Sequence, residues 1–370
     1  MRTALLKMTK NTLKLQYRMD KETTNKAIDL LKTLIQTSSF SGEEDKTANL
    51  IQDWMESLFI STERSMNNIW AVNKYFDEKK PTILLNSHHD TVKPNSGYTL
   101  NPFEANIIDG KLYGLGSNDA GGSLVSLMAL FVHYYFEEDL NYNLILAATA
   151  EEENSGANGI KHLLPFLPNI NFAVVGEPTE MQLAVAEKGL LVIDGQAKGI
   201  AGHAAHDNTE NAIYNAMEDI QWIKDFEFSK VSQVLGKVKM SVTQFKAGKQ
   251  HNLVPSDCHF VIDVRTNEEY SNQEVFSTIN EHTKSELTPR SLNLNSSSIP
   301  IEHPIVQAGI NLGRKTYGSP TLSDQANLNC PSLKIGPGDS KRSHSSDEYI
   351  YLSEIEEGIE MYKQLFNKIL

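Results

Sequence analysis

Apolar residues recur at helical spacing near the start of the chain. Residues 23–36 form one amphipathic pattern, and residues 51–58 form a second one. Between them, Ser41 and Glu44 stand three positions apart as S-x-x-E, the spacing of a capping box at a helix N-terminus. The pattern therefore predicts two helices, the second of them capped by Ser41 and Glu44.

Three short apolar runs then change the pattern. Ile83–Leu85, Leu144–Ala148 and Phe172–Val175 are each too short for a buried helix and are typical of buried strands. An apolar helical stretch over 124–136 lies between the first two, which favours parallel strands joined by crossovers. Each run leads directly into polar residues, in order His88–Asp90, Glu151–Glu153 and Glu177. Ligands bind outside the carboxyl ends of such strands, so we expect these side chains to gather at one sheet edge.

The pattern changes again after residue 188. Strand signals lie at 189–195, 238–245 and 259–264, with a helix around 211–223, and residues 291–298 fit a return linker. We therefore predict an α/β protein of two domains. A larger domain with a mostly parallel central sheet covers 20–189 and 298–370, and an inserted α+β domain covers 190–297. Residues 1–19 carry five basic residues and no acidic one, and we expect a flexible N-terminal extension there.

Composition narrows the function classes. The chain has 370 residues, of which 40% are hydrophobic, so it has enough apolar material for a packed core. Its net charge of −13 argues against nucleic acid or an anionic membrane as partner. Two cysteines exclude a disulfide scaffold and a four-cysteine zinc site, and they favour the reducing cytoplasm.

Five residues form a donor set for metal ions: His88, Asp119, Glu153, Glu177 and His344. Two imidazoles and three carboxylates suit a pair of divalent ions, and one carboxylate can bridge both. Each residue also has an ordinary interpretation on its own. His88 and Asp90 fit either a metal-bound imidazole held by a carboxylate or a polar turn. The glutamates fit either a compensated site or a solvated loop.

Other chemistries fit the chain less well. The glycines around Asp119 do not match a dinucleotide loop, because Asp119 stands where the third glycine belongs, and they fit an ordinary turn equally well. The sequence has neither a G-x-S-x-G elbow nor an H-E-x-x-H helix. Cys258 and Cys330 are better explained as packing residues than as nucleophiles.

In combination, five motifs resemble the zinc-dependent amidohydrolase and peptidase family that includes acetylornithine deacetylase, succinyl-diaminopimelate desuccinylase and carboxypeptidase G. They are S-H-H-D-T-V at 87–92, G-L-G-S-N-D-A-G-G at 114–122, T-A-E-E-E at 149–153, V-V-G-E-P-T at 174–179 and G-P-G-D-S-K-R-S-H at 336–344. The resemblance extends over nearly the whole chain after residue 20.

The resemblance implies a role for each matched position. His88 and Glu177 would bind one metal ion, Glu153 and His344 the other, and Asp119 would bridge them. Asp90 would orient His88, and Glu152 would be the general base toward a bridging water. The family motif reads D-E-E where this chain has Glu151–Glu153, so a one-residue shift of Glu152 and Glu153 stays open. The implied cofactors are two divalent ions, zinc first, with cobalt or manganese as alternatives.

The resemblance also gives the inserted domain a role as a lid and dimerisation domain. It implies a homodimer in which His203, or less well His206, reaches across to the reacting oxyanion. Asn252, in H-N-L-V-P, would contact the substrate. Arg265, in D-V-R-T, would bind a substrate carboxylate, or it forms a salt bridge at the end of a strand.

These positions together predict a two-metal deacylase for a small N-acyl amino acid. Acetylornithine, in arginine biosynthesis, is the first candidate substrate, and acetylcitrulline is an alternative. A desuccinylase or a dipeptidase remains open, and a succinyl group calls for an extra cation such as Lys93 or Arg342. Outside the class, the alternative is a non-catalytic homologue that binds amino acids.

Overall fold

The computed structural model describes residues 21–207 and 209–370, so the predicted extension over 1–19 lies outside the described residues. The chain forms two compact units. Of the described residues, unit 1 comprises 21–184, Ile299–Thr316 and Asn329–Leu370, and unit 2 comprises Val185–Ser298 and Tyr317–Leu328. No helix in the described part of the chain is long and apolar enough to cross a membrane.

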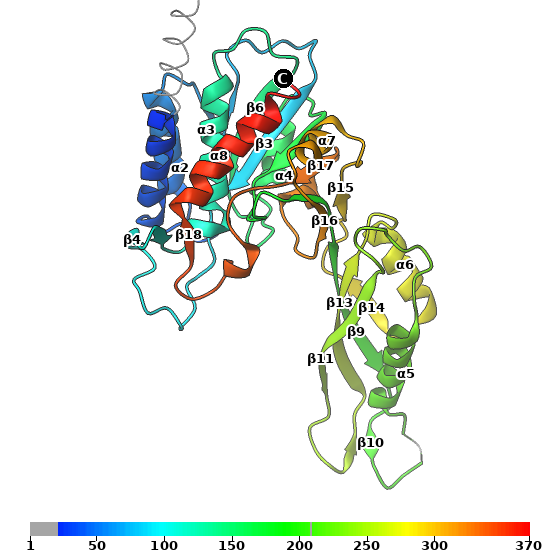
Figure 1. Ribbon diagram of the computed structural model, residues 1–370. Helices are drawn as coiled ribbons and strands as arrows, with labels where there is room; N and C mark the ends of the chain where they lie inside the picture. Colours follow the sequence, from blue (N-terminus) through cyan, green and yellow to red (C-terminus); the bar gives the residue numbers. More distant parts are fainter. Residues whose placement is uncertain (1–20, 208) are drawn as a thin grey trace, which may run out of the picture. The chain divides into compact units, whose positions relative to one another are not determined.

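A nine-stranded mixed sheet has most of its strands in unit 1, with β3 near its centre (Figure 1). Its strands run in the order β1 (Glu63–Ser65), β2 (Asn68–Val72), β6 (Asn143–Thr149), β3 (Thr82–His88), β7 (Phe172–Val175), β17 (Ser332–Lys334), β8 (Leu183–Glu187) and β15 (Ser297–Ser298), and β16 (Thr316–Ser319) also pairs with β8. Of these strands, β15 and most of β8 and β16 belong to unit 2. The four strands β6, β3, β7 and β17 are parallel to one another. The predicted parallel strands and the α/β class are confirmed.

The central strands are buried along their whole length, as their uninterrupted apolar runs require. All seven residues of β3 and all seven of β6 are buried. Helix α3 (Gly122–Tyr134) packs on both strands and on α8 (Leu352–Phe366). The remaining helices of unit 1 are a helix over 21–35, α2 (Asp45–Ser57), α4 (Ile160–Leu163), η2 (Leu164–Phe166), α7 (Pro304–Asn311) and η4 (Ser340–Arg342).

The capping box predicted at Ser41 and Glu44 is wrong. Glu44 is the N-cap of α2, and neither its own side chain nor that of Ser41 caps the helix. Both side chains instead bond toward the ends of the sheet strands, Ser41 to Asp90 and Glu44 to the Glu151 amide. The spacing along the chain suggested a helix cap, but the Ser41 hydroxyl and the Glu44 carboxylate form hydrogen bonds with residues distant in sequence instead.

A small antiparallel sheet joins the loops that contain Asp119 and His344. It consists of β4 (Asn106–Ile108), β5 (Lys111–Tyr113) and β18 (Tyr349–Tyr351). The short helical turn η1 (Ser117–Gly121) follows β5 and contains Asp119. β18 follows the loop that contains His344, so the ladder between β5 and β18 brings these two loops together.

Unit 2 is a four-stranded antiparallel sheet with helices on one face. Its strands lie in the order β11 (Lys239–Ala247), β13 (Asp257–Thr266), β9 (Gly189–Lys198) and β14 (Glu286–Pro289). In β9, buried residues alternate with partly exposed ones, the period of a sheet covered on one side. The covering helices are α5 (Ala212–Asp225) and α6 (Asn272–His282), and the unit also contains the short strands β10 (Gly202–His203) and β12 (Leu253–Val254) and the turn η3 (Asp324–Asn327).

Candidate metal centre

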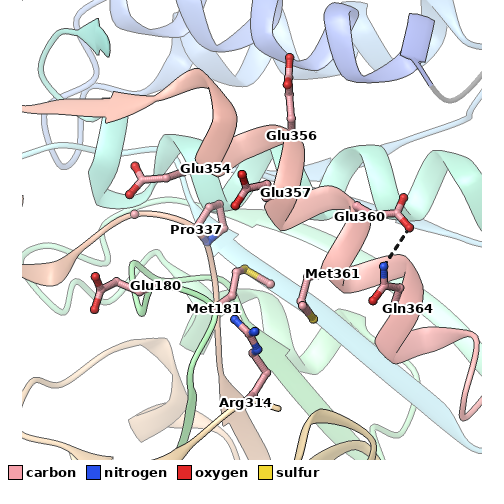
Figure 2. A pocket seen from close by; sticks show the side chains of 11 residues that line it. Glu180, Met181, Arg314, Pro337, Glu354, Glu356, Glu357, Glu360, Met361 and Gln364 are labelled. Carbon is pink, nitrogen blue, oxygen red and sulfur yellow. Dashed lines mark hydrogen bonds between the residues drawn. The ribbon is translucent and has the colours of Figure 1, made fainter. Parts of the chain in front are cut away.

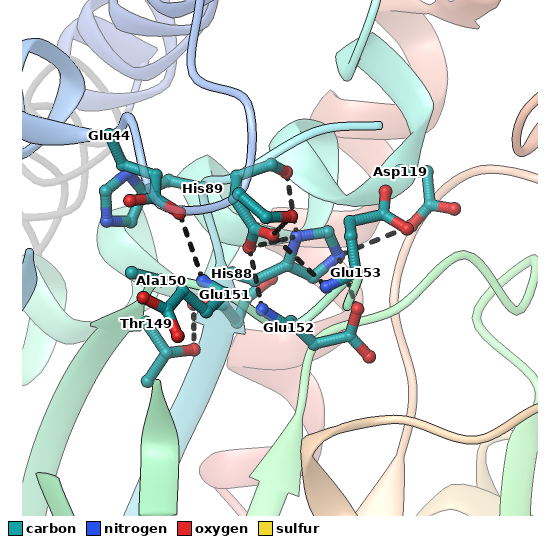
Figure 3. A network of polar contacts seen from close by, with 12 residues as sticks. Glu44, His88, His89, Asp119, Thr149, Ala150, Glu151, Glu152 and Glu153 are labelled. Atoms are coloured by element: carbon teal, nitrogen blue, oxygen red, sulfur yellow. Dashed lines mark hydrogen bonds and ion pairs between the residues drawn. The ribbon is translucent and has the colours of Figure 1, made fainter. Parts of the chain in front are cut away.

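A cluster of histidine and carboxylate side chains lies at the carboxyl ends of the parallel strands of unit 1 (Figure 3). His88 is the last residue of β3, Glu152 and Glu153 follow β6, and Glu177 follows β7. Asp119 comes from η1, and His344 from the loop after β17. Parallel pairing aligns the strand exits, so residues distant in sequence meet at one edge.

His88 is at the centre of the cluster and is 1% exposed. Its Nδ1 lies 3.0 Å from the backbone oxygen of Asp90, which fixes the orientation of the ring. Its Nε2 faces carboxylate oxygens of Asp119 at 3.4 Å, Glu177 at 3.7 Å and Glu152 at 3.8 Å. Among the described residues this buried Nε2 has no hydrogen-bond partner. With Nδ1 donating to the Asp90 oxygen, Nε2 is left to face the three carboxyl groups, and a cation bound there would replace the proton on Nε2 and accept its lone pair.

A second histidine lies on the other side of Asp119. His344 Nε2 is 2.8 Å from Glu153 Oε2 and 3.6 Å from Asp119 Oδ2. Asp119 Oδ1 faces His88, so this carboxylate turns one oxygen toward each imidazole. The described residues contain two groups with metal-ligand spacing, which are His88 with Glu152 and Glu177, and His88 with Asp119 and Glu153.

The ionisable groups perturb one another strongly. Burial alone would lower the pKa of His88, but Glu152, Asp119 and Asp90 hold that pKa well above its ordinary value. Burial raises the pKa of Glu177 to about 8, with a contribution from Asp119. The hydrogen bond to Glu153 raises the pKa of His344 to about 9. These directions reflect an excess of buried negative charge, which binds protons or metal cations.

The glutamate triplet divides between two directions. Glu151 turns away, and its carboxylate accepts hydrogen bonds from the Asn158 backbone N–H and side-chain amide. Glu152 and Glu153 face the histidines. Of the possible registers, the geometry thus brings Glu152 and Glu153 to the cluster and leaves Glu151 outside it.

The Asp90 carboxylate does more than the sequence analysis expected. Its Oδ1 accepts the Glu152 N–H at 3.0 Å, and its Oδ2 accepts the Glu153 N–H at 3.1 Å and the Ser41 hydroxyl at 2.7 Å. His88 is held mainly by the Asp90 backbone oxygen, since the carboxylate lies 3.4 Å from Nδ1. Asp90 therefore orients both the histidine and the backbone of the two glutamates.

Sequence reasoning missed two buried carboxylates that support the cluster. Glu44 is buried and accepts N–H groups from Gly42 and Glu151. Glu348 accepts N–H groups from the η1 turn. The sequence offered only a weak signal for either, an acidic residue close to a motif, because the donors are backbone groups distant in sequence.

Comparison with known proteins identifies the family. A family model described as Peptidase family M20/M25/M40 matches residues 84–368. The chain belongs to this family. It is a metal-dependent hydrolase, which confirms the class inferred from the motifs.

M20 relatives with different names match the chain equally well. It is 26% identical to a succinyl-diaminopimelate desuccinylase from Rickettsia bellii (strain RML369-C), over 90% of this chain and 94% of the relative. It is also 26% identical to an acetylornithine deacetylase from Proteus mirabilis (strain HI4320), over 91% and 95% of the two chains. A crystal structure of an M20 family metallo-carboxypeptidase from Sulfolobus solfataricus superposes with a TM-score of 0.73 at 16% identity, covering 93% of this chain and 99% of the other. That superposition supports the fold, while the relatives do not single out a substrate.

The three remaining candidate residues of this M20 chain lie in unit 2. His203, on β10, and Asn252 are both exposed. They lie close together, since the Asn252 backbone oxygen accepts the N–H of Ala204, the residue after His203, at 3.1 Å. Arg265 lies near the other end of β13 and forms a two-point ion pair with Asp263 at 2.8 and 3.1 Å. The salt-bridge interpretation of Arg265 thus has a visible partner, and a substrate carboxylate would compete with Asp263 for the guanidinium.

Two cavities of unit 1 differ in their relation to the cluster. One of about 590 Å³ lies along α8, and five of its eleven lining residues are glutamates, none of which belongs to the histidine cluster (Figure 2). A smaller one of about 230 Å³ is lined by His344, Ser345, Tyr98 and Lys93. We place the reacting groups at the cluster, because the smaller cavity opens beside His344 and a third one, of about 20 Å³, is lined by His88, Asp90 and Asp119.

Proposed function

We propose that this chain removes the N-acyl group from an N-acyl amino acid with the help of two divalent metal ions. The observation that carries the proposal is the position of Asp119, with one oxygen toward His88 and the other toward His344. The donor set fits borderline-hard divalent ions, zinc first and cobalt or manganese as alternatives. His88 and Glu177 would hold one ion, Glu153 and His344 the other, and Asp119 both.

The proposed roles of the other residues follow from their positions. When bound, the ions supply Lewis-acid polarisation of the amide carbonyl and make a nearby water more acidic. Glu152 is the proposed general base, and its carboxylate takes a proton from that water and delivers it to the leaving amine. Asp90 holds the Glu152 and Glu153 amides, which keeps both carboxylates on the histidine side. His344 is half exposed, so substrate can reach this side of the cluster.

We also propose that the active form is a homodimer through unit 2. Within unit 2, Arg265 is eight residues along β13 from Asp257, a rise of roughly 26 Å at strand spacing, while Asn252 lies beyond Asp257. One small substrate cannot touch both ends, which supports His203 and Asn252 acting on the partner's substrate. Exposed apolar side chains near β10 and on α5, namely Ile200, Tyr214, Met217 and Leu253, supply surface for such a contact.

Acetylornithine is our first candidate substrate, with a place in arginine biosynthesis in the cytoplasm. The similarity to the Proteus mirabilis acetylornithine deacetylase supports the substrate. The two free cysteines support the reducing cytoplasm as the compartment. The test is amine release from a mixture of acetylornithine, acetylcitrulline, succinylornithine and succinyl-diaminopimelate, resolved by mass, with metal content measured on the same sample. We expect one preferred amine and up to two ions per chain. Activity without metal would refute the mechanism, and turnover of none of the four would favour a dipeptidase or a non-catalytic homologue.

Removal of a succinyl group is a second candidate, and one observation favours it. Lys93 lines the cavity beside His344, where it can meet a second carboxylate of the substrate. Arg342, the other candidate cation, is held by Glu354 at 2.6 and 2.8 Å. If Lys93 selects succinyl substrates, Lys93→Met should lower kcat/KM for succinylornithine about two- to fivefold relative to acetylornithine, the loss of one exposed ion pair of up to about 1 kcal/mol. An unchanged ratio would remove this candidate role.

A further inference from the structure

Glu348 connects the two loops that carry Asp119 and His344. It lies four residues after His344, directly before β18, and is 2% exposed. Its Oε1 accepts the backbone N–H groups of Asn118 at 2.8 Å and Asp119 at 2.9 Å, and its Oε2 accepts that of Gly116 at 3.2 Å. Its own backbone oxygen accepts the Gly114 N–H at 3.0 Å. One side chain thus binds most of the turn that presents Asp119.

Stability alone does not explain a carboxylate at this position, because its burial is unfavourable for the free energy of folding. A buried carboxylate loses its hydration, and Glu348 also lies close to the negative charge of Asp119. An apolar side chain would fill the same space without that cost. The two carboxylate oxygens of Glu348 accept three N–H groups, and an apolar side chain could not do so. These hydrogen bonds fix the orientation of the backbone that carries the Asp119 side chain.

The loop that carries Glu348 is itself anchored at His344 and at Asp347. The Asp347 carboxylate accepts the N–H groups of Thr99 and Leu100 at 2.8 and 2.9 Å. The Asn95 side chain donates to the His344 backbone oxygen at 3.1 Å. After Glu348, the chain pairs with β5, where Tyr349 lies opposite Tyr113. The position of Glu348 is therefore set by the same segment that places the His344 imidazole.

We propose that Glu348 is a positioning residue that holds the Asp119 carboxylate between the two imidazoles, and so sets the affinity for metal. The inference rests on the proposed metal role of Asp119 and His344. Asp119 turns Oδ1 to His88 and Oδ2 to His344 at 3.4 and 3.6 Å, so a small rotation of its backbone moves both oxygens. The hydrogen bonds of the Glu348 side chain go to the turn that presents Asp119 and not to the cluster histidines, while its charge also contributes to the raised pKa of His344.

Glu348→Gln tests the proposal with little change in volume. The amide oxygen can still accept two of the three N–H groups, but its NH2 group then faces the third donor. The turn should loosen, and zinc affinity should fall about 10- to 100-fold, the usual loss when a residue that holds a metal ligand is changed. Asp219→Asn is the matched control, because Asp219 is a carboxylate of unit 2, 4% exposed, that accepts the Lys284 and Ser285 N–H groups.

The experiment measures zinc affinity of the full chain, stripped with a chelator and titrated against a fluorescent zinc indicator. Unfolding temperature is measured on the same stripped samples. We expect both variants to unfold at lower temperature and only Glu348→Gln to bind zinc more weakly. Zinc affinity of Glu348→Gln within twofold of the wild type would overturn the proposal. A wild-type chain that binds no zinc would instead refute the proposed metal site itself.

A second variant keeps the test decisive if Glu348→Gln does not fold. Glu348→Asp retains the charge but is one methylene too short to reach all three N–H groups. It should also weaken zinc binding and shift the visible spectrum of the cobalt-loaded protein, since the Asp119 oxygens move. Wild-type affinity together with a wild-type cobalt spectrum would overturn the proposal.

Discussion

Asp90→Asn should weaken the hydrogen bonds that hold the backbone of Glu152 and Glu153, and so lower both stability and activity. The variant keeps the shape of the side chain but replaces one acceptor oxygen by an NH2 group. Asp90 is 1% exposed and accepts three donors, the Glu152 and Glu153 amides and the Ser41 hydroxyl. Two of these bonds become neutral, at a loss of about 1 kcal/mol each, and one amide N–H loses its acceptor at about 2 kcal/mol. The free energy of unfolding should fall by about 4 kcal/mol in total.

The assay combines unfolding with catalysis. Thermal unfolding in chelator should show a transition lower by roughly 8–16 °C, at 2–4 °C per kcal/mol for a unit of this size. With metal and the preferred substrate, kcat/KM should fall about 10- to 100-fold, because Glu152 and Glu153 lose their backbone anchor. Ser41→Ala is the control, since it removes only one of the three donors and should cost about 1–2 kcal/mol. Asp90→Asn with the stability and activity of Ser41→Ala would refute the argument that the amide bonds orient the glutamates.

Three further predictions concern single residues. Glu152→Gln should keep its metal and lose most of its turnover, and metal analysis with a turnover assay checks this; turnover like that of the wild type would reject the role of base. His203→Ala should lose activity without unfolding, and mixing it with Glu152→Gln should restore part of the activity if His203 acts across the dimer, whereas no rescue argues for a role in its own chain. Burial raises the pKa of Cys330 to about 11 and also raises that of Cys258. At pH 8 the thiolate fraction of Cys330 is then about 100-fold below that of a thiol with the ordinary pKa of 9. A disulfide dye should therefore label both thiols slowly until guanidinium unfolds the chain. Rapid labelling of either thiol in the folded protein would contradict this.

Much of unit 1 was predictable because its elements follow local rules. Uninterrupted apolar runs such as Ile83–Leu85 mark strands covered on both faces, and β3 is buried throughout. The polar residues directly after such runs had to lie at the carboxyl edge of the sheet, whatever the rest of the fold does. That argument located His88, Glu153 and Glu177, and the motifs added Asp119 and His344.

Side-chain partners were not predictable in the same way. Ser41 and Glu44 have the spacing of a helix cap, yet both bond to the strand-end loops, because folding brought stronger partners within reach. Nothing local shows that Glu151 turns toward Asn158 while its two neighbours face the histidines. The return of Tyr317–Leu328 to unit 2 was also absent from the predicted layout.

The distinction follows from how far each interaction extends along the chain. Hydrophobic period, strand exits and residue type depend on a few neighbouring residues, and they establish the α/β class and the chemical character of the cluster. The Glu348 carboxylate meets the Asp119 amide across 229 positions, and Asp90 meets Glu152 across 62. Such bonds depend on loop positions that only the assembled sheet and the β5–β18 ladder define. The folded chain therefore decides which carboxylates face the two imidazoles and which hold the backbone behind them.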